Sequence, residues 1–129
     1  MDQHKPTSKG TFTVKVNDGA EVETTDVDYH LFSGNSPERS GYIIGGWKNP
    51  RVSIGFPPGI KNNEKVTKEY PKDFPLPYLT WAHNGNNAVE GSIEIIFTDS
   101  QRYAKGKYTF KLKDNEQISG EFDVDIVSN

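Results

Sequence analysis

The sequence predicts an all-β protein: an antiparallel β-sandwich of about eight strands with little helix, or alternatively a closed β-barrel. Short segments alternate apolar and polar residues with period two, as strands with one buried face do. Turn-forming residues separate these segments, and no stretch of ten residues has capped helical periodicity. The 129 residues suffice for one domain, so we expect residues 1–9 to form a flexible N-terminal arm and residues 10–129 to form the sandwich.

The N-terminal part of the domain contains a strong hairpin signal. Residues 10–16 alternate as a strand does, and the following Asn17-Asp18-Gly19 favours a tight turn that pairs Val14 with Val22. This strand is expected to join the sheet that carries the C-terminal strands. The alternation then shifts by one residue, which predicts a bulge or a break near Thr25.

A second hairpin is predicted in the middle of the chain, from the segments 42–47 and 52–56. Ile43 and Ile44 are expected to be buried on opposite faces of this hairpin. Its glycines weaken a strand unless a large aromatic ring packs over them. The glycines are Gly45, Gly46 and Gly55, and the candidate rings are Trp47 and Trp81.

The clearest strand pattern lies in the C-terminal third. Segments that begin at Gly91, Gly106 and Gly120 predict a three-stranded antiparallel meander. The side chains expected on its buried face are Tyr108, Phe110, Phe122 and Val124. A three-residue loop at 114–116 would place Lys107 opposite Asp123, so that a basic outer face lies beside an acidic one.

Residues 57–78 are rich in proline and aromatic residues and form the best candidate for a binding site. Residues 66–70 are predicted to be a short edge strand and 79–82 another short strand, but the rest lacks regular structure. Aromatic rings on a rigid loop can stack on sugars, with asparagines as polar contacts. The candidate ligand-binding residues are Trp47, Tyr70, Phe74, Tyr78, Trp81, Asn84 and Asn86, with Asn87 beside them. We expect Phe74 and Tyr78 to be exposed; the alternative is that the rings fold under the loop and anchor it.

Composition and charge argue against several partners and cofactors. The net charge of −3 disfavours nucleic acid, and no segment is apolar enough for a transmembrane helix. There is no cysteine, and neither the five carboxylates between Asp18 and Asp28 nor the three histidines have metal-ligand spacing, so we expect no cofactor and no metal. The chain does not begin with a secretory signal, so we expect a cytoplasmic protein if this start is native and an exported one if a leader has been removed.

The glycine-led segments also carry a family resemblance. Gly91-Ser92-Ile93-Glu94-Ile95, Gly106-Lys107-Tyr108-Thr109-Phe110 and Gly120-Glu121-Phe122-Asp123-Val124 resemble the last strands of small, mostly uncharacterised bacterial all-β domains, many of them lipoproteins. The opening of the domain, Gly10-Thr11-Phe12-Thr13-Val14, is similar as well. The lipoprotein leader with its cysteine is absent here. The resemblance implies an all-β fold and a bacterial origin, and it implies no activity.

The sequence therefore favours a soluble, non-catalytic binding module, with carbohydrate as the first candidate ligand. An accessory or effector-type module that binds a protein is the alternative, and its partner includes a second copy of the chain in a homodimer. A hydrolase that uses a pair of carboxylates is a further alternative, although the sequence contains no motif for nucleophilic catalysis.

Overall fold

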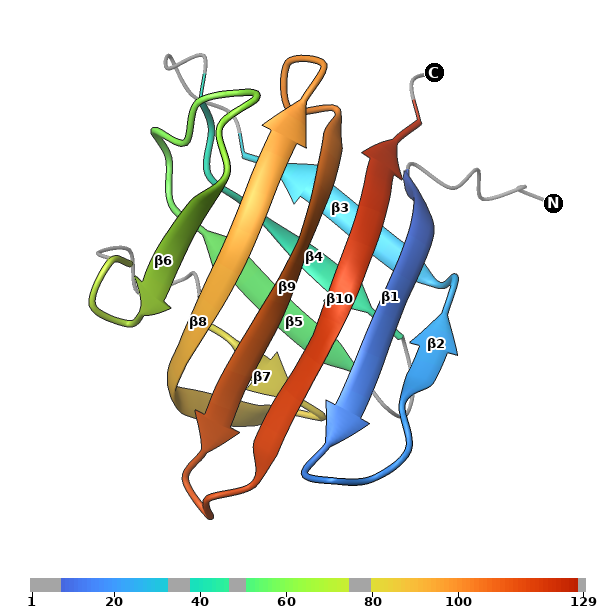
Figure 1. The fold of residues 1–129 in the computed structure, drawn as a ribbon, viewed down its shortest axis with the longest axis vertical. Coiled ribbons are helices and arrows are strands. Elements are labelled where there is room, and N and C mark those ends of the chain that lie inside the picture. Colours follow the sequence, from blue (N-terminus) through green and yellow to red (C-terminus); the bar gives the residue numbers. More distant parts are fainter. Residues whose placement is uncertain (1–7, 33–37, 47–50, 75–79, 128–129) are drawn as a thin grey trace, which may run out of the picture.

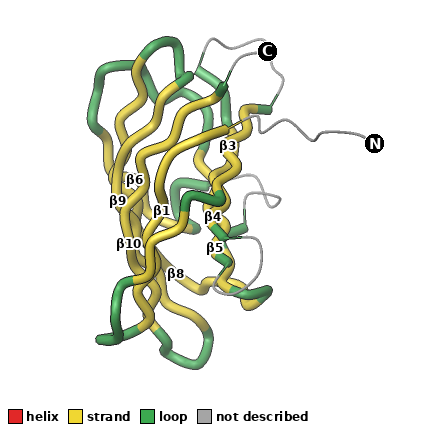
Figure 2. Tube along the Cα trace, turned by 90° about the vertical axis from the view of Figure 1, so that its right-hand side faces the viewer, coloured by secondary structure: helices red, strands yellow, loops and turns green. Residues whose placement is uncertain are grey.

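The described residues of the chain fold into ten antiparallel strands that form two layers (Figures 1 and 2). The computed structural model describes residues 8–32, 38–46, 51–74 and 80–127, and within these ranges it contains no helix. The strands are β1 (Ser8–Val16), β2 (Val22–Thr24), β3 (Val27–Leu31), β4 (Gly41–Gly45), β5 (Val52–Phe56), β6 (Val66–Tyr70), β7 (Ala82–His83), β8 (Asn86–Thr98), β9 (Tyr103–Leu112) and β10 (Gln117–Ile126). The predicted all-β class, the low helix content and the antiparallel arrangement are confirmed.

One long strand joins the two layers. The front sheet in Figure 1 has the order β2-β1-β10-β9-β8-β6, and the back sheet has the order β3-β4-β5-β7. Strand β8 belongs to both sheets, because Asn86 and Asn87 pair with β7 while Gly91 to Ile95 pair with β6 and β9. A register shift between Ala88 and Glu90 marks the place where β8 passes from one sheet to the other. The back strands consequently run diagonally behind the front ones (Figure 1).

The opposite side of the sandwich is nearly closed by a side chain. The Ser8 hydroxyl accepts a hydrogen bond from the Tyr29 N–H at 2.8 Å and donates one to the Tyr29 carbonyl at 3.1 Å. Strand β1 of the front sheet is thereby tied to β3 of the back sheet without a strand ladder. The sandwich therefore has some character of the barrel alternative. Ser8 and Lys9, which we expect in the arm, belong to β1 and pair with β10.

Aromatic rings fill the space between the layers where a facing strand has glycine. A side chain at Gly45 on β4 would collide with the ring of Phe12 on β1, so the ring over this glycine is Phe12 and not a tryptophan. Trp81 is fully buried and donates from Nε1 to the Gly55 carbonyl at 3.0 Å. Trp47 lies outside the described residues.

The C-terminal meander is confirmed, but its predicted register is wrong. Tyr108, Phe110, Phe122 and Val124 are all at most 3% exposed. Lys107 pairs with Glu121 instead of Asp123, and Lys105 pairs with Asp123. The reason is that the three-residue turn lies one position earlier, over residues 113–115, closed by a hydrogen bond from the Leu112 N–H to the Glu116 carbonyl at 2.8 Å. A shift of two residues leaves every side chain on its predicted face.

Several predictions for the first half are confirmed and two need correction. Val14 pairs with Val22, and the chain breaks between β2 and β3, near Thr25. Val22 is nevertheless 46% exposed, because β2 is a three-residue strand at the edge of the front sheet. Ile43 is fully buried, whereas Ile44 is only partly buried and lies on the outer face of the back sheet. Strand β6 pairs only with β8, as expected of an edge strand.

The contact between Gly45 and Phe12 can be tested by overpacking. We expect Gly45→Ala to lower the free energy of unfolding by about 1–3 kcal/mol, because the added methyl group must displace a ring held between two sheets. Urea unfolding of the variant and the parent measures the difference. In a Phe12→Leu background the penalty is expected to be smaller, since leucine is shorter and can turn away. An equal penalty in both backgrounds would show that the two positions do not interact.

Candidate functional site

The aromatic residues of the predicted loop site pack mainly inside the protein. Trp81 is fully buried and Phe74 is 6% exposed. The Trp81 ring stacks on Tyr70, with centroids 4.9 Å apart, and meets the edge of Phe74 at 5.4 Å. The expectation that Phe74 is an exposed contact is therefore wrong, and these rings anchor the chain around β6 as in the alternative interpretation. Tyr78 lies outside the described residues, as Trp47 does.

The predicted asparagines occupy the hairpin between β7 and β8. Asn84 and Gly85 have φ values of 49° and 86°, the left-handed conformation that a two-residue turn requires. The Asn84 side-chain oxygen accepts a hydrogen bond from the Arg51 N–H at 2.8 Å, so this residue has a role in holding the turn. Asn86 and Asn87 are exposed and line a hollow of about 430 Å³ beside the β9–β10 turn. Ligand binding at these asparagines stays a prediction.

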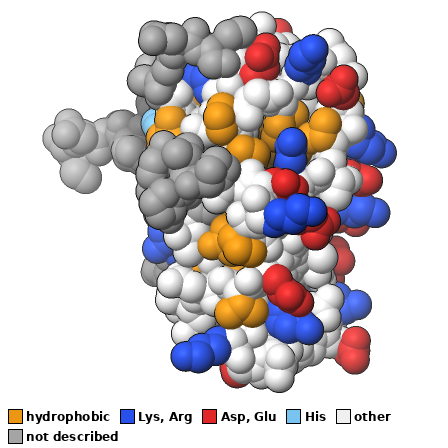
Figure 3. All heavy atoms as spheres, turned by 90° about the vertical axis from the view of Figure 1, so that its left-hand side faces the viewer, with side chains coloured by type: hydrophobic (Ala, Val, Ile, Leu, Met, Phe, Trp, Pro, Cys, Tyr) orange, Lys and Arg blue, Asp and Glu red, His pale blue; other side chains and the backbone are white. Residues whose placement is uncertain are grey.

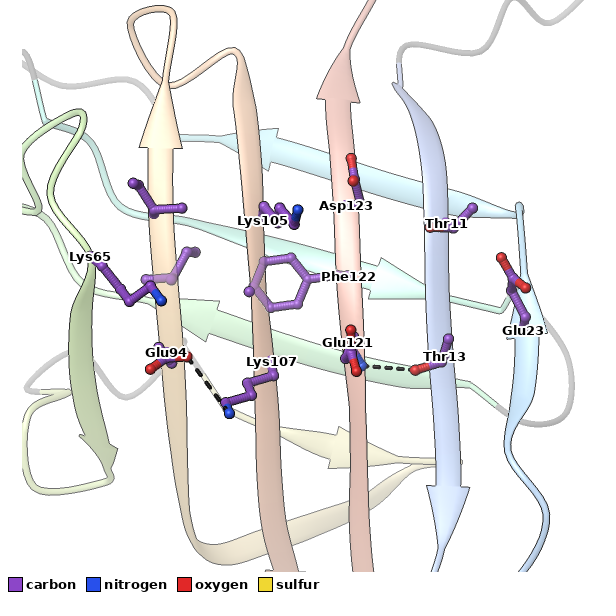
Figure 4. Close-up of a pocket in the computed structure, with 13 residues that line it drawn as sticks. Thr11, Thr13, Glu23, Lys65, Glu94, Lys105, Lys107, Glu121, Phe122 and Asp123 are labelled. Atoms are coloured by element: carbon purple, nitrogen blue, oxygen red, sulfur yellow. Dashed lines mark hydrogen bonds and ion pairs between the residues drawn. The ribbon is translucent and has the colours of Figure 1, made fainter.

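A larger hollow, of about 770 Å³, lies on the outer face of the front sheet (Figure 4). We call it the central hollow. Strands β1, β10, β9 and β8 form its floor, β2 borders one end, and Lys65, which precedes β6, borders the other. The polar side chains that line it are Thr11, Thr13, Glu23, Lys65, Glu94, Lys105, Lys107, Glu121 and Asp123. Four acids therefore face three lysines and two threonines.

The strand registers arrange these side chains in rows across the sheet. In one row Glu121 lies opposite Lys107, which lies opposite Glu94, with a distance of 3.9 Å between Lys107 Nζ and Glu94 Oε1. In the next row Asp123 lies opposite Lys105. Neighbouring strands thus present opposite charges, and Figure 3 shows acidic and basic side chains intermingled along its right-hand margin, where the front sheet lies.

The centre of the hollow is fixed by a contact from the core. The buried Tyr108 hydroxyl donates to the Thr13 carbonyl at 2.7 Å, and the Thr13 hydroxyl oxygen accepts the Glu121 N–H at 2.8 Å (Figure 4). These two bonds replace part of the ladder between β1 and β10. They require glycine at 120, because a Cβ there would collide with the Thr13 carbonyl oxygen and would lie 2.7 Å from the Tyr108 hydroxyl oxygen. Burial raises the pKa of Tyr108, so its hydroxyl stays a proton donor at neutral pH.

Tyr103 contacts an acid of the second row, in which Asp123 lies opposite Lys105. Its hydroxyl is hydrogen-bonded to the Asp123 carboxylate, and Asp125 lies opposite it on β10. Burial first, then the hydrogen bond and the negative charges of these acids, raise the pKa of Tyr103 to about 12. Tyr103 therefore keeps its proton at physiological pH and orients Asp123 beside the hollow.

The outer face of the back sheet carries a group of aromatic side chains that the sequence did not suggest. His30 and Tyr42 lie opposite each other on β3 and β4, with ring centroids 5.2 Å apart, and Phe32 contacts both rings. The Tyr42 hydroxyl donates to Asp28 at 3.4 Å, and burial followed by the charge of Asp28 raises the Tyr42 pKa. His30 is exposed, so this group offers a small aromatic surface.

Among the residues of the central hollow, the charged side chains of β9 and β10 were expected as solvated pairs that set the strand register. The available signal was the change of sign between the outer faces of β9, with Lys105 and Lys107, and β10, with Glu121 and Asp123. For the back sheet, the alternation that points Tyr29 inward also points Asp28 and His30 outward. Both patterns predict the sheet face on which these side chains lie, but neither predicts a hollow on that face.

Neither a metal cluster nor a membrane-spanning helix is found in the described ranges. Within these residues, no three side chains of His, Cys, Asp or Glu are grouped so that they could hold a metal ion. In the same part of the chain, no helix has the length and hydrophobicity to cross a membrane.

Comparison with known proteins identifies no relative. No protein-family model matches the chain, and neither the curated proteins nor the solved structures contain a match. The resemblance to bacterial lipoprotein-like domains therefore stays a prediction.

His83 is a buried titratable group near the junction of the sheets. Its side chain is 7% exposed, and Nδ1 has no hydrogen-bond partner among the described residues and lies 4.0 Å from Glu116 Oε1. Burial lowers the His83 pKa, and the charge of Glu116 opposes this shift in part. The unfolded chain therefore binds a proton more readily than the folded chain. The stability contributed by neutral His83 is complete above the ordinary pKa of 6.5 and is lost as the pH falls through 6.5 toward the lower folded value.

Thermal unfolding as a function of pH tests this contribution. Between neutral pH and about pH 5, we expect the parent to lose more stability than His83→Gln, by about 1.4 kcal/mol for each unit of pKa depression. His30→Gln, which removes an exposed histidine of the back sheet, is the matched control. Parallel pH profiles for the parent and His83→Gln would refute the lowered pKa.

Proposed function

We propose that this protein is a non-catalytic binding module that holds a neutral, hydroxyl-rich ligand, and first of all a carbohydrate, in the central hollow. The observation that carries the proposal is the row of acids, lysines and threonines across the front sheet, in which hydrogen-bond donors and acceptors alternate.

The chemistry of the row matches hydroxyl groups. A sugar hydroxyl donates and accepts hydrogen bonds, a carboxylate such as Glu121 only accepts, and an ammonium such as Lys107 only donates. A ligand with many hydroxyls can therefore satisfy both kinds of side chain at neighbouring positions. The acids exceed the lysines by one, so the lining favours neither a polyanion nor a strongly basic peptide.

The surroundings of the carboxylates support binding over hydrolysis. A glycosidase needs one carboxyl group that is held protonated in apolar surroundings. Glu121 is exposed and lies opposite Lys107, and Glu94 forms an ion pair with the same lysine. These acids are arranged as acceptors beside ammonium groups, in a hollow open to water.

The backbone hydrogen bonds at the sheet edges favour a ligand that binds on the sheet face over a protein partner that adds a strand at an edge. On β6 the N–H of Glu69 donates to the Asp73 side chain and its carbonyl accepts the Asp73 N–H, both at 2.8 Å. On β3 the Ser8 hydroxyl occupies both backbone groups of Tyr29. On each of these two edges, one residue already uses the backbone N–H and carbonyl groups with which an added strand would pair. On the part of the β6 side of the molecule that Figure 3 draws in colour, hydrophobic side chains reach the surface among polar and charged ones.

A glycan array followed by calorimetry tests the proposed function. Among neutral, acidic and basic glycans, we expect the hits to be neutral. The double variant Glu121→Gln/Lys107→Met should weaken binding of the best hit by about tenfold or more, because charge-assisted hydrogen bonds are lost. These side chains are exposed, so circular dichroism should show an unchanged fold.

Two further variants locate the ligand. Glu64→Gln/Lys61→Met removes the same side-chain types at exposed positions outside the hollow, and it should bind as the parent does. His30→Ala removes the exposed ring of the back sheet and should also bind normally. Loss of binding in His30→Ala with normal binding in Glu121→Gln/Lys107→Met would move the site to the back sheet. An array without neutral hits would refute the proposed function.

A further inference from the structure

We propose that the ligand is an extended chain of linked sugar units that lies across the strands of the front sheet. This inference rests on the proposed function and adds to it the form and the direction of the ligand.

The basis is one row of side chains that crosses six strands. Thr13 pairs with Glu23 on one side and bonds the Glu121 backbone on the other. Beyond Lys107 and Glu94, the row reaches β6. Its members in spatial order are Glu23, Thr13, Glu121, Lys107, Glu94 and Thr67. With about 4.8 Å between neighbouring strands, the row is about 24 Å long, which exceeds the length of a single sugar unit several times.

The central hollow follows this row from Glu23 to Glu94, and Lys65 borders it beyond Glu94. Its lining begins at Glu23 on β2 and ends at Lys65 before β6, and Figure 4 shows these two side chains at opposite ends with Lys65 directed toward β8. Both end residues are exposed. A ligand of one or two units can occupy only part of this length, so a longer chain gains additional contacts at the ends.

A separate hollow on the same sheet argues against a chain that runs along the strands. This lower hollow, of about 750 Å³, lies over the other end of β8 and β9 and includes the hydroxyls of Ser92 and Thr109. It is bordered by Tyr70 and Pro71, so one of the predicted aromatic residues does line a cavity. The two hollows share no lining residue, and a chain along the strands would have to pass over the boundary between them.

Binding as a function of chain length tests the proposal. Calorimetry is performed with cello-, xylo- and malto-oligosaccharides from disaccharide to hexasaccharide, or with the same length series of the neutral glycan that the array identifies. We expect the hexasaccharide to bind the parent at least about tenfold more tightly than the disaccharide, since each added unit can form further hydrogen bonds. Equal affinity for both lengths would overturn the proposal.

Two pairs of substitutions determine the direction of the chain. Glu23→Gln/Lys65→Met changes both ends of the central hollow and should weaken the hexasaccharide more than the disaccharide. Ser92→Ala/Thr109→Val removes two hydroxyls of the lower hollow and should leave the length dependence unchanged. The reverse pattern would show that the chain runs along the strands and would overturn the proposal. If no neutral glycan binds the parent, the proposed function itself fails, which is a different result from binding without length dependence.

Discussion

The close approach of the two sheets depends on aromatic rings that lie where the facing backbone carries no side chain. Phe12 occupies the position over Gly45, and Trp81 lies against Gly91, where a Cβ would be 2.8 Å from the indole ring. Trp81 also reaches across to the Gly55 carbonyl. Because these two rings are matched to glycines, the layers can approach closely, and the inner faces of the described strands carry the buried core. Only the outer faces and the edges are left for a ligand.

The core nevertheless controls the outer face at one point. Tyr108 is buried between the layers, but its hydroxyl bonds the Thr13 carbonyl within the front sheet. Because the Thr13 carbonyl bonds Tyr108, the Glu121 N–H donates to the Thr13 hydroxyl oxygen instead. This second bond fixes the positions of Thr13 and Glu121 in the central hollow. Gly120 makes the arrangement sterically feasible. The positions of Thr13 and Glu121 on the outer face are thus set in part by the packing of the buried Tyr108. This gives the central hollow a rigid centre.

The sequence contains enough information for the strands and their faces, because alternation with period two is a local property. It identifies the buried rings of β9 and β10 correctly, and it identifies the hairpin that pairs Val14 with Val22. It does not determine register, since a shift of two residues at the β9–β10 turn satisfies the same alternation. The burial of Phe74 also escaped prediction, because it depends on Trp81 and Tyr70, whose rings meet it only in the folded chain. The central hollow combines six segments from Thr11 to Asp123, so no local pattern indicates it.

The edges bear on why a sheet face is the proposed binding surface. An exposed edge strand invites pairing with another chain, and here one residue on each of two edge strands already has its outward backbone groups hydrogen-bonded within the protein. Asp73 takes both free backbone groups of Glu69, and Ser8 takes both of Tyr29. The third edge, β2, has only three residues. A sandwich whose edges are blocked in this way can keep an open, polar sheet face in water without becoming a template for aggregation. The same alternation of charges that keeps this face solvated also provides donors and acceptors in a fixed order, so the requirement for solubility and the capacity to bind hydroxyl groups are met by one set of side chains.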